Sequence, residues 1–212
     1  MEESARKKVK EVTLDLAPTM ERIIKKSFPK AKMVADRFHL QQLASDAVQQ
    51  IRIDHRWQAI EQKNKEIELA KEAKIPFVPD ILKNGDILKQ LLTRSRYLLF
   101  KKQQYWSVPQ VHRAEILFRL YPDLQQAYQF SRKLSDIFTH SKEIIIVFKK
   151  LVFWYNDVEK ESFKSFNTIA KTIENNYENF LNFFDNRSTN ASAESFNLSG
   201  EPCKDKGFQK LV

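Results

Sequence analysis

The fold is decided by Val9-Lys-Glu-Val-Thr-Leu-Asp-Leu16 and, after a helical segment, by Lys32-Met-Val-Ala-Asp36. Both runs are short and rich in apolar residues, as is typical of strands, and the first alternates apolar and polar residues. Between them, residues 19–27 repeat apolar residues on one helical face until Pro29 ends the helix. A strand, helix, strand series of this length predicts a parallel β-α-β unit.

The rest of the chain is expected to be mostly helical. Only three glycines and seven prolines occur in 212 residues, which predicts long helices joined by few turns. From Leu40 onward the apolar period is helical with long polar stretches, and an extended arm is expected before residues 76–84 and the turn at Gly85 interrupt it. Further helices are predicted over 87–102, 108–120, 122–139, 141–156 and 160–181. Aromatic residues such as Phe148, Phe153 and Trp154 are expected to pack a helical core.

Charge and cysteine content narrow the class of protein. The formal net charge of +9 favours a polyanionic partner through phosphate neutralisation. Cys203 is the only cysteine, so we expect a reducing, cytoplasmic setting. The most apolar run, residues 144–153, is broken by Lys149 and Lys150, and we therefore expect no membrane span.

Acidic and imidazole side chains follow both strand-like runs. Asp15 ends the first, at the edge where open parallel sheets bind ligands, although an Asp there can also cap the next helix. Asp36 and His39 follow the second, three residues apart. Such a pair can orient one another or approach a metal, and it can equally form a structural hydrogen bond.

A third group of polar residues lies in the run from Thr189 to Asn197. Asn190, Glu194 and Asn197 recur at about one helical turn, which places them on one face of a helix. The same run also fits an ordinary capped helix start, because Thr189 or Asn190 precedes an acid at capping distance.

A basic stretch with no acidic residue runs from Ile87 to Ala114. Aromatic residues are interleaved with its cations, as in proteins that bind nucleic acid, but a solvated basic face with its aromatic rings packed inward fits equally well. The cations are Lys89, Arg94, Arg96, Lys101, Lys102 and Arg113, and the rings are Tyr97, Phe100, Tyr105 and Trp106.

Two blocks of the chain, Phe28 to Leu40 and Asn186 to Asn197, resemble signature blocks of bacterial insertion-sequence transposases of the ISL-three lineage. The runs 91–100 and 121–128 between them fit too, and the resemblance spans about residues 9–197. It implies a mostly helical α/β fold, namely a partial ribonuclease-H-like domain with a large all-α insertion. The implied domains are a strand-helix-strand core over 1–40, the insertion over 41–184, the returning catalytic-Glu helix over 185–197 and a divergent tail over 198–212.

The resemblance also implies a DDE-type site holding two Mg²⁺ or Mn²⁺ ions, since hard divalent ions prefer carboxylate oxygen. Asp15 becomes the second acid and Glu194 the third, both as metal ligands. Asp36 joins the catalytic set, with His39, Asn190 and Asn197 in support. A rival alignment makes Asp36 the second acid.

The implied function is metal-dependent cleavage and strand transfer of DNA at transposon ends, with DNA as partner and a homo-oligomer as a further possibility. The family's first Asp lies on an upstream strand, beyond the eight residues that precede Val9. We therefore expect a truncated fragment that lacks this acid and the N-terminal DNA-binding region, and that is inactive alone. The alternatives are a non-catalytic basic helical protein that binds nucleic acid, and a helical partner of full-length transposase.

Overall fold

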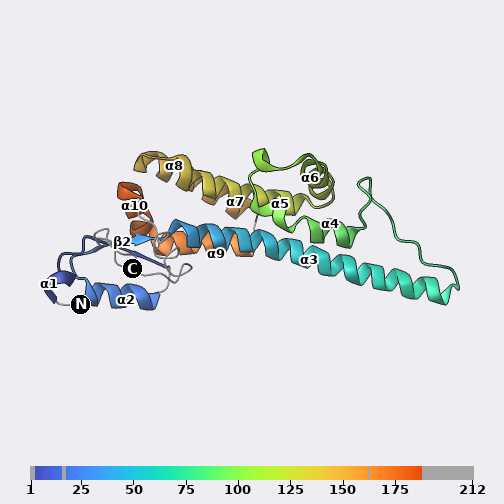
Figure 1. Ribbon diagram of the computed structural model, residues 1–212, viewed down its shortest axis with the longest axis horizontal. Coiled ribbons are helices and arrows are strands. Elements are labelled where there is room, and N and C mark those ends of the chain that lie inside the picture. Colours follow the sequence, from blue (N-terminus) through green and yellow to red (C-terminus); the bar gives the residue numbers. More distant parts are fainter. Residues whose placement is uncertain (1–2, 16–17, 162, 188–212) are drawn as a thin grey trace, which may run out of the picture. The chain divides into compact units, whose positions relative to one another are not determined.

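The computed structural model describes residues 3–15, 18–161 and 163–187 (Figure 1). The chain divides into two compact units, which are described separately below. Unit 1 comprises residues 1–43 and 135–212, and unit 2 comprises residues 44–134. Helices α3 (Arg37–Glu72) and α7 (Pro122–His140) run through the boundaries, so the insertion expected over 41–184 is shared between the units.

Unit 1 contains the predicted parallel β-α-β unit. Strand β1 (Glu11–Leu14) pairs with β2 (Lys32–Ala35) in parallel, with Glu11 opposite Lys32 and Leu14 opposite Ala35. Helix α2 (Pro18–Ser27) connects them, and the short α1 (Glu3–Arg6) precedes β1. The expectation of a mostly helical α/β fold is therefore confirmed, and the finer assignment to a ribonuclease-H-like domain is taken up below.

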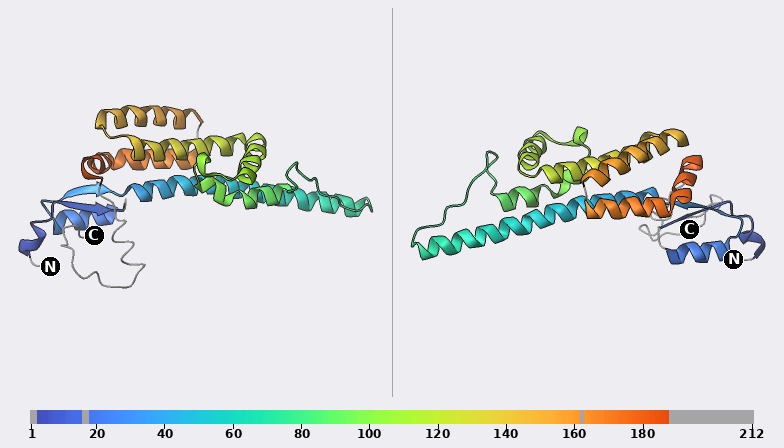
Figure 2. Two further views of the ribbon diagram at one scale, coloured as in Figure 1. Left: turned by 45° about the horizontal axis from the view of Figure 1, so that its top comes forward. Right: turned by 180° about the vertical axis from the view of Figure 1, so that it is seen from behind.

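Helices cover both faces of the two strands, as Figure 2 shows. On one face, Val12 and Leu14 form a buried cluster with Ile24 of α2. On the other face, the Asn182 side chain of α10 (Tyr177–Asn186) donates a 2.8 Å hydrogen bond to the Met33 carbonyl. Asp185 of α10 also pairs with Lys32. Helix α2 thus buries Val12 and Leu14 of β1, and α10 packs against β2.

The other helices of unit 1 pack through aromatic residues. Helix α8 (Ile144–Glu161) buries Val147, Leu151, Trp154 and Val158, and Trp154 meets Phe166 of α9 (Lys164–Asn175) with ring centroids 6.5 Å apart. The expectation of a core role holds for Trp154, which is 1% exposed. It is wrong for Phe148 and Phe153, which are 50% and 68% exposed, because they lie outside the stripe of α8 that is buried.

Unit 2 holds most of α3, followed by α4 (Leu88–Arg94), α5 (Arg96–Phe100), the 3-10 turn η1 (Gln103–Tyr105), α6 (Val108–Leu120) and the start of α7. Its aromatic centre is Trp106, Phe118 and Tyr128, whose ring centroids lie 5.6–6.2 Å apart. The Trp106 indole also donates a 2.8 Å hydrogen bond to the Leu98 carbonyl. This bond ties η1 to α5.

The observed helices differ in three places from those that the apolar periodicity predicts. The expected arm is a single helix of 36 residues that begins directly after β2, at Arg37. The helix expected over 87–102 is broken at Ser95 into α4 and α5, and the helix expected over 160–181 is broken at Asn176. The expected turn at Gly85 is confirmed, since its φ of +79° lies in the left-handed region that glycine adopts without strain.

Candidate functional site

Asp15 and Asp36 meet at the carboxyl edge of the two strands. The Asp36 N–H donates a 3.1 Å hydrogen bond to the Leu14 carbonyl, so the pairing of β1 with β2 continues one step beyond the strands. In this register Asp15 lies opposite Asp36. Neighbouring strands are about 4.8 Å apart, which brings the two residues to one place on the sheet.

The two carboxylates have different surroundings. Asp15 is exposed. Asp36 is 1% exposed, and its Oδ1 accepts a 2.9 Å hydrogen bond from the Phe38 N–H. Because Phe38 is the second residue of α3, this bond caps the helix. His39 lies half-buried in the same first turn, so the Asp-x-x-His spacing reflects, at least in part, a capped helix start.

Capping predicts different effects for two substitutions of Asp36. Asp36→Ala should lower the free energy of unfolding by about 1–2 kcal/mol, because the Phe38 amide loses its acceptor. Asp36→Asn keeps an acceptor oxygen and should cost clearly less. Urea denaturation followed by circular dichroism measures both. Equal stability of the alanine variant and the wild type would exclude the capping role.

The remaining members of the expected carboxylate site, Glu194, Asn190 and Asn197, lie outside the described residues. Within the described ranges, no group of three or more His, Cys, Asp and Glu side chains could hold a metal ion. The described part of the site therefore consists of Asp15 and Asp36, with His39 nearby in sequence.

Arg187 fixes the end of α10, from which the chain continues toward Glu194. Its φ of 52° is left-handed and ends the helix. Its guanidinium donates hydrogen bonds to the Phe138 carbonyl at 3.4 Å, the Thr139 carbonyl at 3.2 Å and the Ser141 carbonyl. These are the carbonyl groups at the end of α7, where a cation is favourable. We call this arrangement the Arg187 clamp.

The basic stretch of unit 2 divides into paired and exposed cations. Asp86, which is 1% exposed, pairs with Arg94 and, at 3.3 Å, with Arg113. The basic stretch itself contains no acid, but Asp86 directly precedes it. In the folded chain this carboxylate pairs with two arginines of the stretch. Lys89, Arg96 and Lys101 are exposed, and Lys102 is partly exposed.

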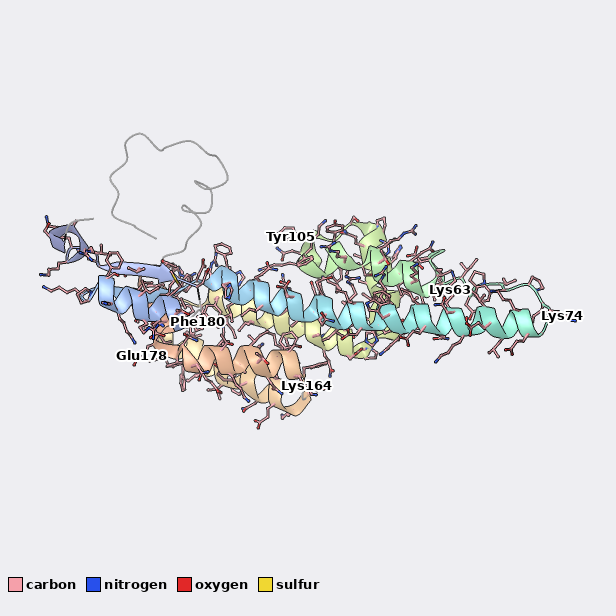
Figure 3. All side chains as sticks on the ribbon, turned by 90° about the horizontal axis from the view of Figure 1, so that it is seen from below. Lys63, Lys74, Tyr105, Lys164, Glu178 and Phe180 are labelled. Atoms are coloured by element: carbon pink, nitrogen blue, oxygen red, sulfur yellow. The ribbon has the colours of Figure 1, made fainter. Side chains whose placement is uncertain are left out.

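The aromatic rings of this stretch also divide. Trp106 packs inward on Phe118 and Tyr128. Tyr97 and Tyr105 are 67% and 66% exposed, and Figure 3 shows Tyr105 at the surface. Inward packing therefore describes only part of the stretch, and the exposed Tyr97 ring has the Arg96 guanidinium 5.6 Å from its centroid.

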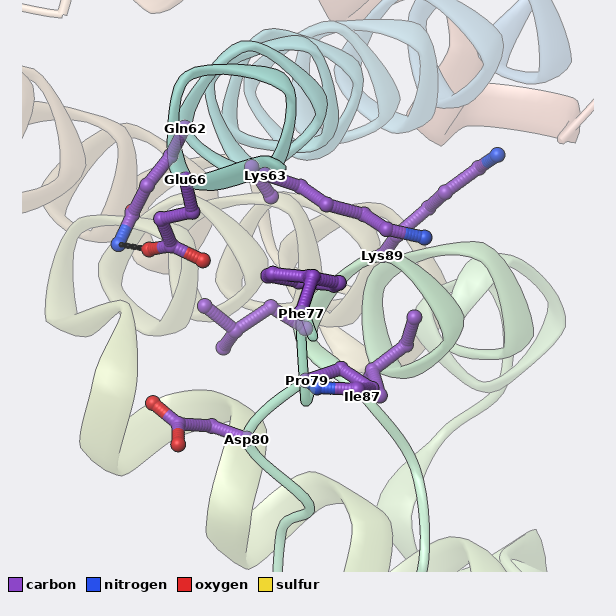
Figure 4. Close-up of a pocket in the computed structure, with 10 residues that line it drawn as sticks. Gln62, Lys63, Glu66, Phe77, Pro79, Asp80, Ile87 and Lys89 are labelled. Atoms are coloured by element: carbon purple, nitrogen blue, oxygen red, sulfur yellow. Dashed lines mark hydrogen bonds between the residues drawn. The ribbon is translucent and has the colours of Figure 1, made fainter. Parts of the chain in front are cut away.

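A small pocket lies between α3, the segment around Phe77 and the start of α4 (Figure 4). Its volume is about 50 Å³, enough for only a few water molecules. In Figure 4 the side chains of Lys63 and Lys89 extend to the same side of the pocket. Lys63 is a neighbour of the basic stretch that sequence spacing did not identify, because 26 positions separate it from Lys89.

Acids at the carboxyl edge of parallel strands, in a chain with an exposed basic surface, suit a protein that acts on nucleic acid. The chain belongs to the ISL3-type DDE transposase family, since the family model DDE_Tnp_ISL3, described as Transposase, matches residues 1–208. No curated protein and no solved structure matches the chain. In the ranges that the structure describes, no helix is both long enough and apolar enough to cross a membrane.

Proposed function

We propose that this chain supplies part of the catalytic centre of a DNA transposase, which cleaves and joins phosphodiesters at transposon ends with divalent metal ions. The observation that carries the proposal is the register of Asp15 and Asp36 at one edge of a parallel sheet. Family membership supplies the reaction class. The same register supports a ribonuclease-H-like core, in which carboxylates on neighbouring strands face one site.

The donor set fits Mg²⁺ or Mn²⁺, because these ions prefer carboxylate oxygens. We assign Asp15 and Glu194 as the metal ligands. Asp15 has an exposed carboxylate, whereas Asp36 is buried and already accepts the Phe38 amide. Asp36 then positions the edge of the sheet, with His39, Asn190 and Asn197 as supporting groups. Bound divalent ions would activate the attacking oxygen and stabilise the leaving one.

Binding of Mn²⁺ tests this assignment without requiring activity. We expect Asp15→Asn and Glu194→Gln each to weaken Mn²⁺ binding by roughly tenfold or more, because each removes one anionic ligand. Electron paramagnetic resonance of free Mn²⁺ in a titration measures the affinity. Asp36→Asn should have a smaller effect.

The matched control is Glu61→Gln, which removes one exposed carboxylate from α3 without touching the strand edge. If Glu61→Gln weakened binding as much as Asp15→Asn, the metal would be attracted by general charge and the site would be wrong. A larger loss in Asp36→Asn than in Asp15→Asn would support the rival alignment, in which Asp36 is the second acid.

The second candidate function is non-catalytic binding of nucleic acid. It is favoured by the exposed Tyr97 and Tyr105 beside the exposed cations Lys89, Arg96 and Lys101. In the transposase these residues, together with Lys102, form the proposed DNA-binding set, whereas Arg94 and Arg113, which the sequence also indicated for it, are paired with Asp86. DNA binding by a protein that binds no Mn²⁺ would favour this second function.

A further inference from the structure

Three arginines gather along one side of unit 2. Arg52 and Arg56 lie one turn apart on α3, and Arg96 is the first residue of α5. Arg52 donates to the Leu92 carbonyl at 3.0 Å and to Gln49 Oε1 at 2.7 Å. Gln49 in turn donates to the Arg96 carbonyl at 3.1 Å. These bonds hold α3 against the junction of α4 and α5.

Arg56 joins the same junction. Its Nε donates a 3.2 Å hydrogen bond to Thr93 Oγ1, in the last turn of α4. The positive charges of Arg56 and Arg96 both act on Arg52. We call Arg52, Arg56 and Arg96 the arginine cluster.

In the part of the chain that the structure describes, the arginine cluster has no counterion. Among the residues that the structure describes, no carboxylate forms an ion pair with Arg52, Arg56 or Arg96, in contrast to Arg94 and Arg113 on Asp86. Arg52 is only 6% exposed. Burial lowers its pKa from the usual value, and the positive charges of Arg96 and Arg56 lower the pKa further. A buried cation beside like charges is costly, and a bound anion would offset that cost.

Exposed aromatic rings flank the arginine cluster. Trp57 is 55% exposed and Tyr97 is 67% exposed. The guanidinium of Arg56 lies 5.8 Å from the centroid of the Trp57 ring, and that of Arg96 lies 5.6 Å from the centroid of the Tyr97 ring. A planar guanidinium group can donate two parallel hydrogen bonds to phosphate oxygens, and exposed aromatic rings can stack on bases. Both kinds of group occur here side by side.

We propose that the arginine cluster binds the phosphodiester backbone of DNA through Arg56 and Arg96, next to the buried charge of Arg52, with Trp57 and Tyr97 contacting the adjoining bases or sugars. The identity of the anion as DNA rests on the proposed function. The site adds Arg52, Arg56 and Trp57, which lie far from the basic stretch in sequence. It also separates Arg56 and Arg96 from Arg94 and Arg113, which are both paired with Asp86.

The test is the affinity of the full chain for a 5′-fluorescein random-sequence duplex, measured by anisotropy at several salt concentrations. The double variant Arg56→Ala with Arg96→Ala should bind at least about tenfold more weakly at 50 mM salt. The slope of log affinity against log salt should become shallower by about two, because each lost phosphate contact removes about 0.9. The double variant Arg56→Lys with Arg96→Lys keeps the positive charge but loses the planar guanidinium groups. Its affinity for DNA should lie between those of the wild type and the double alanine variant.

The matched control is Lys65→Ala with Lys71→Ala, which removes the same charge from exposed positions of the same helix. Its affinity should change by less than about threefold, because these lysines lie outside the cluster. The arginine double variant should stay folded, with an unchanged or raised melting temperature, since it relieves repulsion at Arg52.

Three results would overturn the arginine cluster as a DNA site. Equal losses of DNA affinity in the arginine and lysine double variants would show that only general positive charge matters. Unchanged DNA affinity of the arginine double variant would exclude the arginine cluster as a DNA site. In either case DNA binding by the wild type would leave the proposed transposase function standing. No binding of the wild type to DNA at low salt would overturn both.

Discussion

The double variant Arg94→Met with Arg113→Met is expected to unfold with a free energy lower than that of the wild type by about 3–5 kcal/mol. Asp86 is 1% exposed and pairs with both arginines. Without these arginines, the charge of Asp86 stays buried. The Asn84 side-chain amide still donates a 2.9 Å hydrogen bond to Asp86 Oδ2. Urea denaturation followed by circular dichroism measures the loss.

The control adds Asp86→Asn to the same double variant. It removes the stranded charge and should restore part of the stability, and together with Asp86→Asn alone and the wild type it completes a thermodynamic cycle. Equal stability of the double variant and the wild type at pH 7 would exclude a structural role for the ion pairs.

Affinity of the chain for DNA is expected to fall roughly hundredfold between 50 and 200 mM salt, without preference for sequence. Four cations of the basic stretch remain outside the Asp86 pairs, and each phosphate contact adds about 0.9 to the salt slope. Contacts between cations and phosphates carry no sequence information directly. Anisotropy titrations with transposon-end and unrelated duplexes of equal length measure both properties.

Poly-glutamate of matched charge density provides the control for this measurement. Equal affinity for the peptide and for DNA would show a general attraction to polyanions. A strong preference for the transposon end would contradict the prediction, because it would require contacts to base edges. An affinity that is independent of salt would contradict the charge argument itself.

Local pattern was sufficient to predict the β-α-β start and several helices. Alternating residues give Glu11–Leu14, and the helices expected over 108–120 and 122–139 agree with α6 and α7 to within a residue. The secondary structure of these elements is determined by residues that are close together in the sequence. The pairing register that brings Asp15 opposite Asp36 follows from the same short connection.

Contacts between distant residues could not be read from the sequence. Nothing in the spacing of Asp86 indicates that it accepts Arg94 and Arg113 at once, since their approach depends on how α4 and α6 pack. The arginine cluster has the same origin, because 40 positions separate Arg56 from Arg96. Periodicity also could not tell that Ser95 interrupts a helix, since its neighbours on both sides favour continuation.

The Arg187 clamp has a consequence for the entropy of assembling the proposed metal site. Seven positions separate Arg187 from Glu194, and a chain of that length spans at most about 25 Å whatever conformation it adopts. Chain length alone therefore limits the distance of Glu194 from Arg187, and Arg187 is held at the end of α7. A tethered group of this kind has an effective concentration in the millimolar range or above, without any contact of its own. The hydrogen bonds of Arg187 to three carbonyl groups fix the point at which this tether starts.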